Sequence, residues 1–142
     1  MRALGLDLGT RRIGVAVSDD QGRVATPIEV VDARDRAAAR RSIAGLVDEW
    51  EAGVVVVGLP LSLDGSEGRA AGAARREAAE LAKMLPVPVE VHDERLTTVE
   101  ADRSLMANEM NAQARRRVVD KVAAAVMLQS WLDRAGSERA DG

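Results

Sequence analysis

Residues 4–14 have the sequence Leu4-Gly5-Leu6-Asp7-Leu8-Gly9-Thr10-Arg11-Arg12-Ile13-Gly14, and they predict two strands joined by a tight turn. Apolar side chains alternate along one side before the turn, and the extended pattern continues over residues 15–18. Asp7 is the exception, because an ionised carboxylate on a buried strand is costly unless it is paired or binds a cation. Gly5 and Gly9 flank Asp7 on its own face and leave room for a close approach. We therefore interpret Asp7 as the first ligand of a metal site.

The composition limits the kind of metal that such a site could hold. The chain has no Cys and one His, which excludes disulfides, thiolate sites and zinc sites of the usual His/Cys kind. A metal would have to be held by carboxylates, which favours Mg²⁺ or Mn²⁺. With 142 residues, 46% of them hydrophobic, the chain is long enough for one domain with a real core. We expect that domain to span residues 1–135 and to be followed by a disordered polar tail at 136–142.

The net charge and the hydropathy pattern limit the partners. The first residues lead directly into a strand and no apolar run approaches membrane-spanning length, so we expect no signal peptide, no membrane contact and a cytoplasmic location. A net charge of −3 argues against a histone-like nucleic-acid binder. Nearly all the positive charge is Arg, which prefers planar contact with phosphate or carboxylate groups, although surface Arg residues also pair with Glu on helices.

The hydrophobic periodicity predicts a β-β-β-α-β-α-β-α-α order. This order is typical of a mixed α/β fold, with an antiparallel meander followed by βα units and with helices on both faces of one sheet. Asp35 is expected to cap the first helix, and Pro27 indicates an edge strand or a bulge. After the first two strands, the expected elements are a strand at 23–31, a helix at 36–50, a strand at 54–59, a helix at 67–85, a strand at 87–92, a helix from about 98 to 108 and a helix at 117–134.

Further carboxylates are expected near Asp7. Asp93 and Glu94 follow the strand at 87–92, and ligands gather at the carboxyl ends of parallel strands. Asp120 shares a helical stripe with core residues and should therefore point toward the sheet. Converging carboxylates repel one another unless cations intervene, and two divalent ions can support phosphodiester hydrolysis. The alternatives are a helix-dipole role for Asp120 and a solvated acidic loop at the other two residues.

Several basic residues could contact phosphates beside such a site, or could simply be solvated. His92 could shuttle protons, but a packed histidine at a strand end is an equally simple interpretation. The basic candidates are Arg11, Arg12, Arg95, Arg115, Arg116, Arg117 and Lys121.

Four segments together resemble the YqgF/RuvX family of bacterial RNase H-like proteins, described as pre-16S rRNA processing nucleases and as relatives of Holliday-junction resolvases. The segments are 4–19 (LGLDLGTRRIGVAVSD), 57–68 (VGLPLSLDGSEG), 93–98 (DERLTT) and 120–133 (DKVAAAVMLQSWLD). They occur in the family's order and spacing over nearly the whole chain. The resemblance implies an RNase H-like, five-stranded sheet whose first three strands are antiparallel.

The resemblance also implies an activity. The family's acidic triad carries over onto Asp7, Glu94 and Asp120 as catalytic residues and metal ligands for two Mg²⁺ or Mn²⁺ ions. In our working hypothesis Asp7 bridges both ions, and each of the other two carboxylates completes one coordination shell. The implied substrate is pre-16S rRNA, with single-stranded or branched DNA as a further candidate. The motifs leave open the choice between RNA and DNA, endo- and exonucleolytic cutting, and a monomer or a homodimer.

Two other functions fit parts of the sequence. The Asp-Leu-Gly-Thr turn also occurs in the actin and sugar-kinase ATPase group, but those proteins close a cleft between two such lobes. The second alternative is a non-catalytic nucleic-acid or ribosome-assembly module that keeps the fold without cutting.

Overall fold

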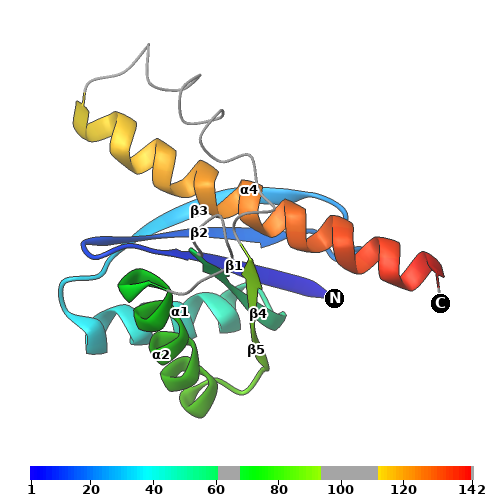
Figure 1. The fold of residues 1–142 in the computed structure, drawn as a ribbon, viewed down its shortest axis with the longest axis horizontal. Helices are drawn as coiled ribbons and strands as arrows, with labels where there is room; N and C mark the ends of the chain where they lie inside the picture. The colour runs from blue at the N-terminus through cyan, green and yellow to red at the C-terminus, as the bar shows by residue number, and fades with distance from the viewer. Residues whose placement is uncertain (61–67, 94–111, 142) are drawn as a thin grey trace.

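The computed structural model describes residues 1–60, 68–93 and 112–141, with side chains in the last stretch described over 120–136. Figure 1 shows their arrangement as one sheet with helices on both faces. The strands and helices are β1 (Arg2–Leu8), β2 (Arg12–Ser18), β3 (Ala25–Asp32), α1 (Arg36–Glu49), β4 (Ala52–Leu59), α2 (Arg69–Met84), β5 (Val89–Asp93) and α4 (Ala112–Asp141).

The sheet has five strands in the order β3-β2-β1-β4-β5. The first three strands pair antiparallel, whereas β4 is parallel to β1 and β5 is parallel to β4. α1 and α2 cover one face, and α4 crosses the other (Figure 1). The predicted fold class, with its antiparallel meander and its two-sided cover of helices, is therefore confirmed.

Side-chain alternation along β1 divides the core into two layers. Leu4 and Leu6 point toward α1 and α2, whereas Ala3 points toward α4. The run of valines in β4 is buried on both faces, as its continuous apolar sequence predicted. On the α4 side the layer is thin, because a Cβ at Gly5 would lie only 2.8 Å from Leu128 Cβ. Small residues on the sheet therefore allow α4 to pack closely.

Two local predictions are confirmed. Asp35 is the N-cap of α1, and its carboxylate accepts a hydrogen bond from the backbone N–H of Ala38 at 3.1 Å. β3 is an edge strand, and the β2–β3 register shifts where Ala16 pairs with Pro27. Proline lacks the N–H that a regular ladder needs, so a bulge at this edge accommodates it.

The ends of several elements differ from prediction. β5 begins at Val89 rather than residue 87, because Pro86 and Pro88 cannot donate to a ladder. α4 begins at Ala112 rather than residue 117 and continues to Asp141 rather than residue 134. Gly136 is the single poor helix former between residues 135 and 140, and one glycine costs only about 1 kcal/mol within a helix. Residues 136–141, predicted as a disordered tail, therefore continue the helix.

Two further predictions concern residues outside the described ranges. The helix expected from about residue 98 lies outside the described residues, as does the expected start of α2 at residue 67. None of the helices in the described part of the chain is both long enough and apolar enough to cross a membrane.

Candidate functional site

The candidate site forms where α4 approaches the β1–β2 hairpin. Asp7 on β1 is the cross-strand partner of Gly14 on β2, so both residues face the same side of the sheet. A Cβ at Gly14 would overlap the backbone oxygen of Asp120, which means that α4, about two turns after its start at Ala112, rests directly on β2. The absence of a side chain at Gly14 therefore brings Asp120 beside Asp7. Asp7 is half-buried, whereas its sequence pattern suggested a buried strand position.

Arg12 supplies a positive charge inside this site. Its Nε donates to Oδ2 of Asp120 at 2.6 Å, and both side chains are partly buried, with 35% and 24% of their surface exposed. Arg12 is two residues before Gly14 on β2 and therefore shares the face that carries Asp7. The guanidinium group, predicted as a contact for nucleic acid, is held by a carboxylate of the predicted metal site.

A row of residues crosses the sheet at the level of Asp7. β1 and β4 are paired up to Leu6 and Val57, so the next pair in that register is Asp7 and Gly58. Gly58 is in turn paired with His92 on β5. Gly14 and Gly58, the two residues directly beside Asp7 in this register, have no side chain. On the Gly14 side, the backbone of α4 at Asp120 fills the space that a side chain would take.

His92 closes the far end of this row. It is 93% buried, since its exposed fraction is 7%, and its Nε2 lies 3.0 Å from Oγ of Ser130 on α4. Burial lowers the pKa of His92, the positive charge of Arg134 lowers it further, and Asp93 acts in the opposite direction. The imidazole is therefore neutral at pH 7 and joins β5 to α4. This geometry favours the packed-histidine interpretation over a proton shuttle.

The remaining predicted site residues are only partly described. Glu94 and Arg95 follow β5 directly but lie outside the described residues, and α4 includes Arg115, Arg116 and Arg117 without described side chains. Lys121 is half-buried, next to Asp120. Arg11 is exposed in the hairpin turn, and its backbone oxygen accepts a hydrogen bond from Ala33 at 2.8 Å. Within the described ranges, no group of three or more His, Asp and Glu residues could hold a metal ion.

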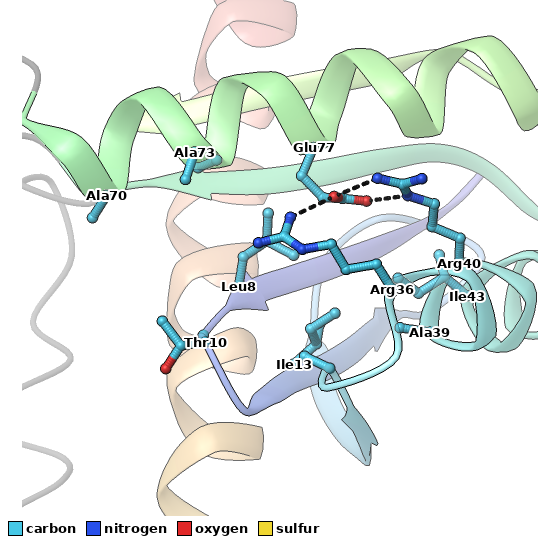
Figure 2. A pocket seen from close by; sticks show the side chains of 13 residues that line it. Leu8, Thr10, Ile13, Arg36, Ala39, Arg40, Ile43, Ala70, Ala73 and Glu77 are labelled. Atoms are coloured by element: carbon cyan, nitrogen blue, oxygen red, sulfur yellow. Dashed lines mark hydrogen bonds and ion pairs between the residues drawn. The ribbon is translucent and has the colours of Figure 1, made fainter.

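A cavity of about 120 Å³ lies on the other face of the sheet, between α1, α2 and the β1–β2 turn. Its wall includes Glu77, which sequence analysis missed. Figure 2 shows Arg36 and Arg40 from α1 both reaching this carboxylate, with Arg40 Nε donating at 2.7 Å and Arg36 Nη1 at 3.2 Å. Hydrogen bonds from Arg40, more than the charges of both arginines, hold the pKa of Glu77 below its ordinary value despite its burial. The available signal was a glutamate on the apolar stripe formed by Ala71, Ala74, Ala78 and Leu81.

Solved structures place this architecture in a known class. The fold is similar to that of Thermus thermophilus RuvC in complex with a Holliday junction substrate, with a TM-score of 0.57 at 16% identity, covering 96% of this chain and 97% of that chain. It is also similar to the fowlpox virus Holliday junction resolvase, with a TM-score of 0.54 at 13% identity over 94% and 99% of the two chains. The protein therefore has the RNase H-like fold of the RuvC-like resolvases.

Sequence comparisons identify the family. The model of the RuvX family, described as Holliday junction resolvase, matches residues 1–134. A relative from Anaeromyxobacter sp. (strain Fw109-5), named as a pre-16S rRNA nuclease, is 54% identical, over 94% of this chain and 97% of its own. A relative of the same name from Geobacillus kaustophilus is 43% identical, over 94% and 98%. The chain belongs to the RuvX family, as its motifs predicted, and its relatives bear the names of nucleases.

Proposed function

We propose that this protein is a divalent-metal-dependent nuclease that hydrolyses phosphodiester bonds during maturation of pre-16S rRNA, with Asp7, Glu94 and Asp120 as metal ligands. The observation that carries the proposal is the contact at Gly14, since it brings two carboxylates from distant parts of the chain to one place. The names of the relatives support the substrate. We further propose that residues 1–135 act as a single domain.

The donor chemistry fits Mg²⁺ or Mn²⁺, the ions that carboxylate oxygens prefer in proteins. Asp7 and Asp120 approach each other at Gly14, and Glu94 follows β5, whose His92 lies in the same row as Asp7. When bound, such ions activate water and stabilise the leaving oxygen of a phosphodiester.

The chain's own residues have distinct tasks in this proposal. Asp7 and Asp120 bind and orient the ions, and Arg12 balances the charge of Asp120 when no ion is present. Arg11 in the turn and Lys121 beside Asp120 contact phosphates next to the scissile bond. Arg95 and Arg115–Arg117 contact phosphates in the same way. Arg12 would do so as well when Asp120 binds an ion and no longer pairs with its guanidinium group.

Cleavage of labelled substrates tests the proposal. Single-stranded RNA of pre-16S rRNA sequence, single-stranded DNA and a four-way DNA junction are incubated with Mg²⁺, Mn²⁺ or chelator. We expect metal-dependent cutting of the RNA by the wild type and its loss in Asp7→Asn and Asp120→Asn. Asp48→Asn, which changes an exposed carboxylate near the end of α1, should cut like the wild type.

Two outcomes would redirect the proposal. Cutting of the junction but not of the RNA would assign the activity to branched DNA. If no substrate is cut by folded protein at saturating metal, while the RNA is bound, the protein is a binding module with a nuclease fold.

A further inference from the structure

The cavity beside the β1–β2 turn is lined partly by the residues that follow Asp7 in sequence. Leu8, Gly9 and Thr10 contribute to its wall, opposite α1 and the first turns of α2. These residues are one to three positions beyond Asp7, so at about 3.3 Å per residue the cavity begins within roughly 10 Å of it. We propose that this cavity is a subsite for one unpaired pyrimidine base of the RNA strand. The inference rests on the proposed nuclease function and adds a base preference to it.

The volume selects a single ring. The cavity measures about 120 Å³, whereas a dry protein cavity of roughly 150 Å³ binds benzene. The proposed occupant is therefore a single six-membered ring, with its substituents at the open mouth, rather than the two fused rings of a purine. Leu8, Ile13 and Ile43 provide an apolar lining for the ring.

The flat partner for the base is an arginine. Unpaired bases in RNA complexes stack on aromatic rings or on guanidinium planes. This chain has no Phe and no Tyr, and its two Trp residues, Trp50 and Trp131, pack against the two core layers. Arg36 lines the cavity, 69% of its side chain is exposed, and its Nη1 is bonded to Glu77. Glu77 thus fixes the guanidinium, while the exposed part remains available to a base and its phosphate (Figure 2).

Polar groups at the mouth complete the recognition. Thr10 is exposed and lines the cavity, so its hydroxyl can bond to the edge of a pyrimidine. Arg36 and Arg40 carry two positive charges against the single negative charge of Glu77. The net positive charge complements the phosphate attached to the base.

Fluorescence anisotropy with end-labelled octauridylate and octaadenylate tests the subsite. The chelator removes metal ions and so prevents cleavage. Low salt strengthens the contacts with phosphate and keeps binding measurable. We expect the wild type to bind octauridylate roughly tenfold more tightly than octaadenylate, which is the size of effect that one stacked base produces. Ala73→Leu, which fills the cavity from α2, and Arg36→Lys, which keeps the charge but removes the plane, should abolish the preference.

Matched controls on the same helices separate the cavity from general effects. Ala79→Leu on α2 and Arg41→Lys on α1 alter exposed positions away from the cavity and should keep the preference. Equal affinity of the wild type for both oligomers, no binding of either, or a preference that survives Ala73→Leu would overturn the subsite.

The subsite and the nuclease function can fail independently. Metal-dependent RNA cleavage without any pyrimidine preference leaves the nuclease proposal intact and removes the subsite. Suppose instead that the wild type prefers octauridylate, that Ala73→Leu abolishes this preference, and that no substrate is cut. That result would support the subsite and reject the nuclease proposal.

Discussion

Gly14 is the residue on which the geometry of the candidate site depends most directly. Its missing side chain lets the backbone of Asp120 contact β2, so any larger residue must push α4 away. We expect Gly14→Ala to lower the free energy of unfolding by about 1–3 kcal/mol, the usual cost of overpacking. Urea unfolding followed by circular dichroism measures the change.

Gly45 offers a matched control for this substitution. It lies in the interior of α1, and a Cβ there would meet nothing within 4 Å. Gly45→Ala should therefore stabilise the protein by roughly 0.5–1 kcal/mol, because alanine loses less backbone entropy in a helix. Equal effects of the two substitutions would contradict the close contact at Gly14.

Arg12 gives a second prediction about a single residue. Because its guanidinium neutralises Asp120, Arg12→Gln should lower the metal-free unfolding free energy by about 1 kcal/mol. The same change should strengthen Mg²⁺ binding, since a competing cation is removed; isothermal titration measures this. Arg34→Gln breaks an exposed pair with Asp32 and should alter neither quantity by more than about 0.5 kcal/mol. Weaker Mg²⁺ binding in Arg12→Gln would refute the competition.

The sequence predicted some of these residues and not others, for a physical reason. The prediction for Asp7 rests on a local signal: a carboxylate stands out within an apolar alternation. The Arg12–Asp120 pair joins residues 108 positions apart, and the contact at Gly14 is made by a helix backbone. Periodicity holds no information about either contact. The family resemblance predicted Asp120 as a ligand but not what holds it in place.

Among the elements, α1 and α2 are joined by one buried carboxylate. Glu77 accepts hydrogen bonds from two arginines of α1, and its pKa lies below its ordinary value of 4.5. These bonds therefore stabilise the fold above that pH, and their contribution is lost as the pH falls through the lower folded-state pKa.

Replacing this carboxylate should have a pH-dependent effect. We expect Glu77→Gln to cost about 1–3 kcal/mol of unfolding free energy at pH 7, and the difference from the wild type to shrink below about pH 4.5. Glu80→Gln, at an exposed position on α2, should cost little at any pH. A penalty for Glu77→Gln that is unchanged at pH 3.5 would contradict the lowered pKa.

Element types were predicted better than element ends. The valine run of β4 and the apolar stripes of α1 and α2 are determined by burial, which periodicity reports. The ends depend on weaker preferences: the first ladder bond of β5 follows Pro88, and α4 tolerates Gly136. Differences of about 1 kcal/mol decide such positions, and they are too small for a pattern to resolve.

At the scale of the whole molecule, metal binding should raise stability, because only the folded chain assembles the carboxylates. Mg²⁺ or Mn²⁺ at 100 times its dissociation constant should add about 2.7 kcal/mol to the unfolding free energy. Chelator should reverse the gain, Asp120→Asn should abolish it, and Asp48→Asn should retain it. Differential scanning calorimetry measures these shifts. An equal gain in Asp120→Asn would exclude Asp120 as a ligand.

The two tryptophans lie in different layers of the molecule. Trp50 packs against the layer that contains α1 and α2, and Trp131 packs against the layer beneath α4. With no Tyr in the chain, the near-ultraviolet fluorescence comes from these two side chains alone. In Trp50→Leu the remaining fluorescence comes from Trp131 and reports on the layer beneath α4. In Trp131→Leu it comes from Trp50 and reports on the layer that contains α1 and α2. Comparing the unfolding of the two variants by fluorescence would show whether the two core layers fold in one step or one after the other.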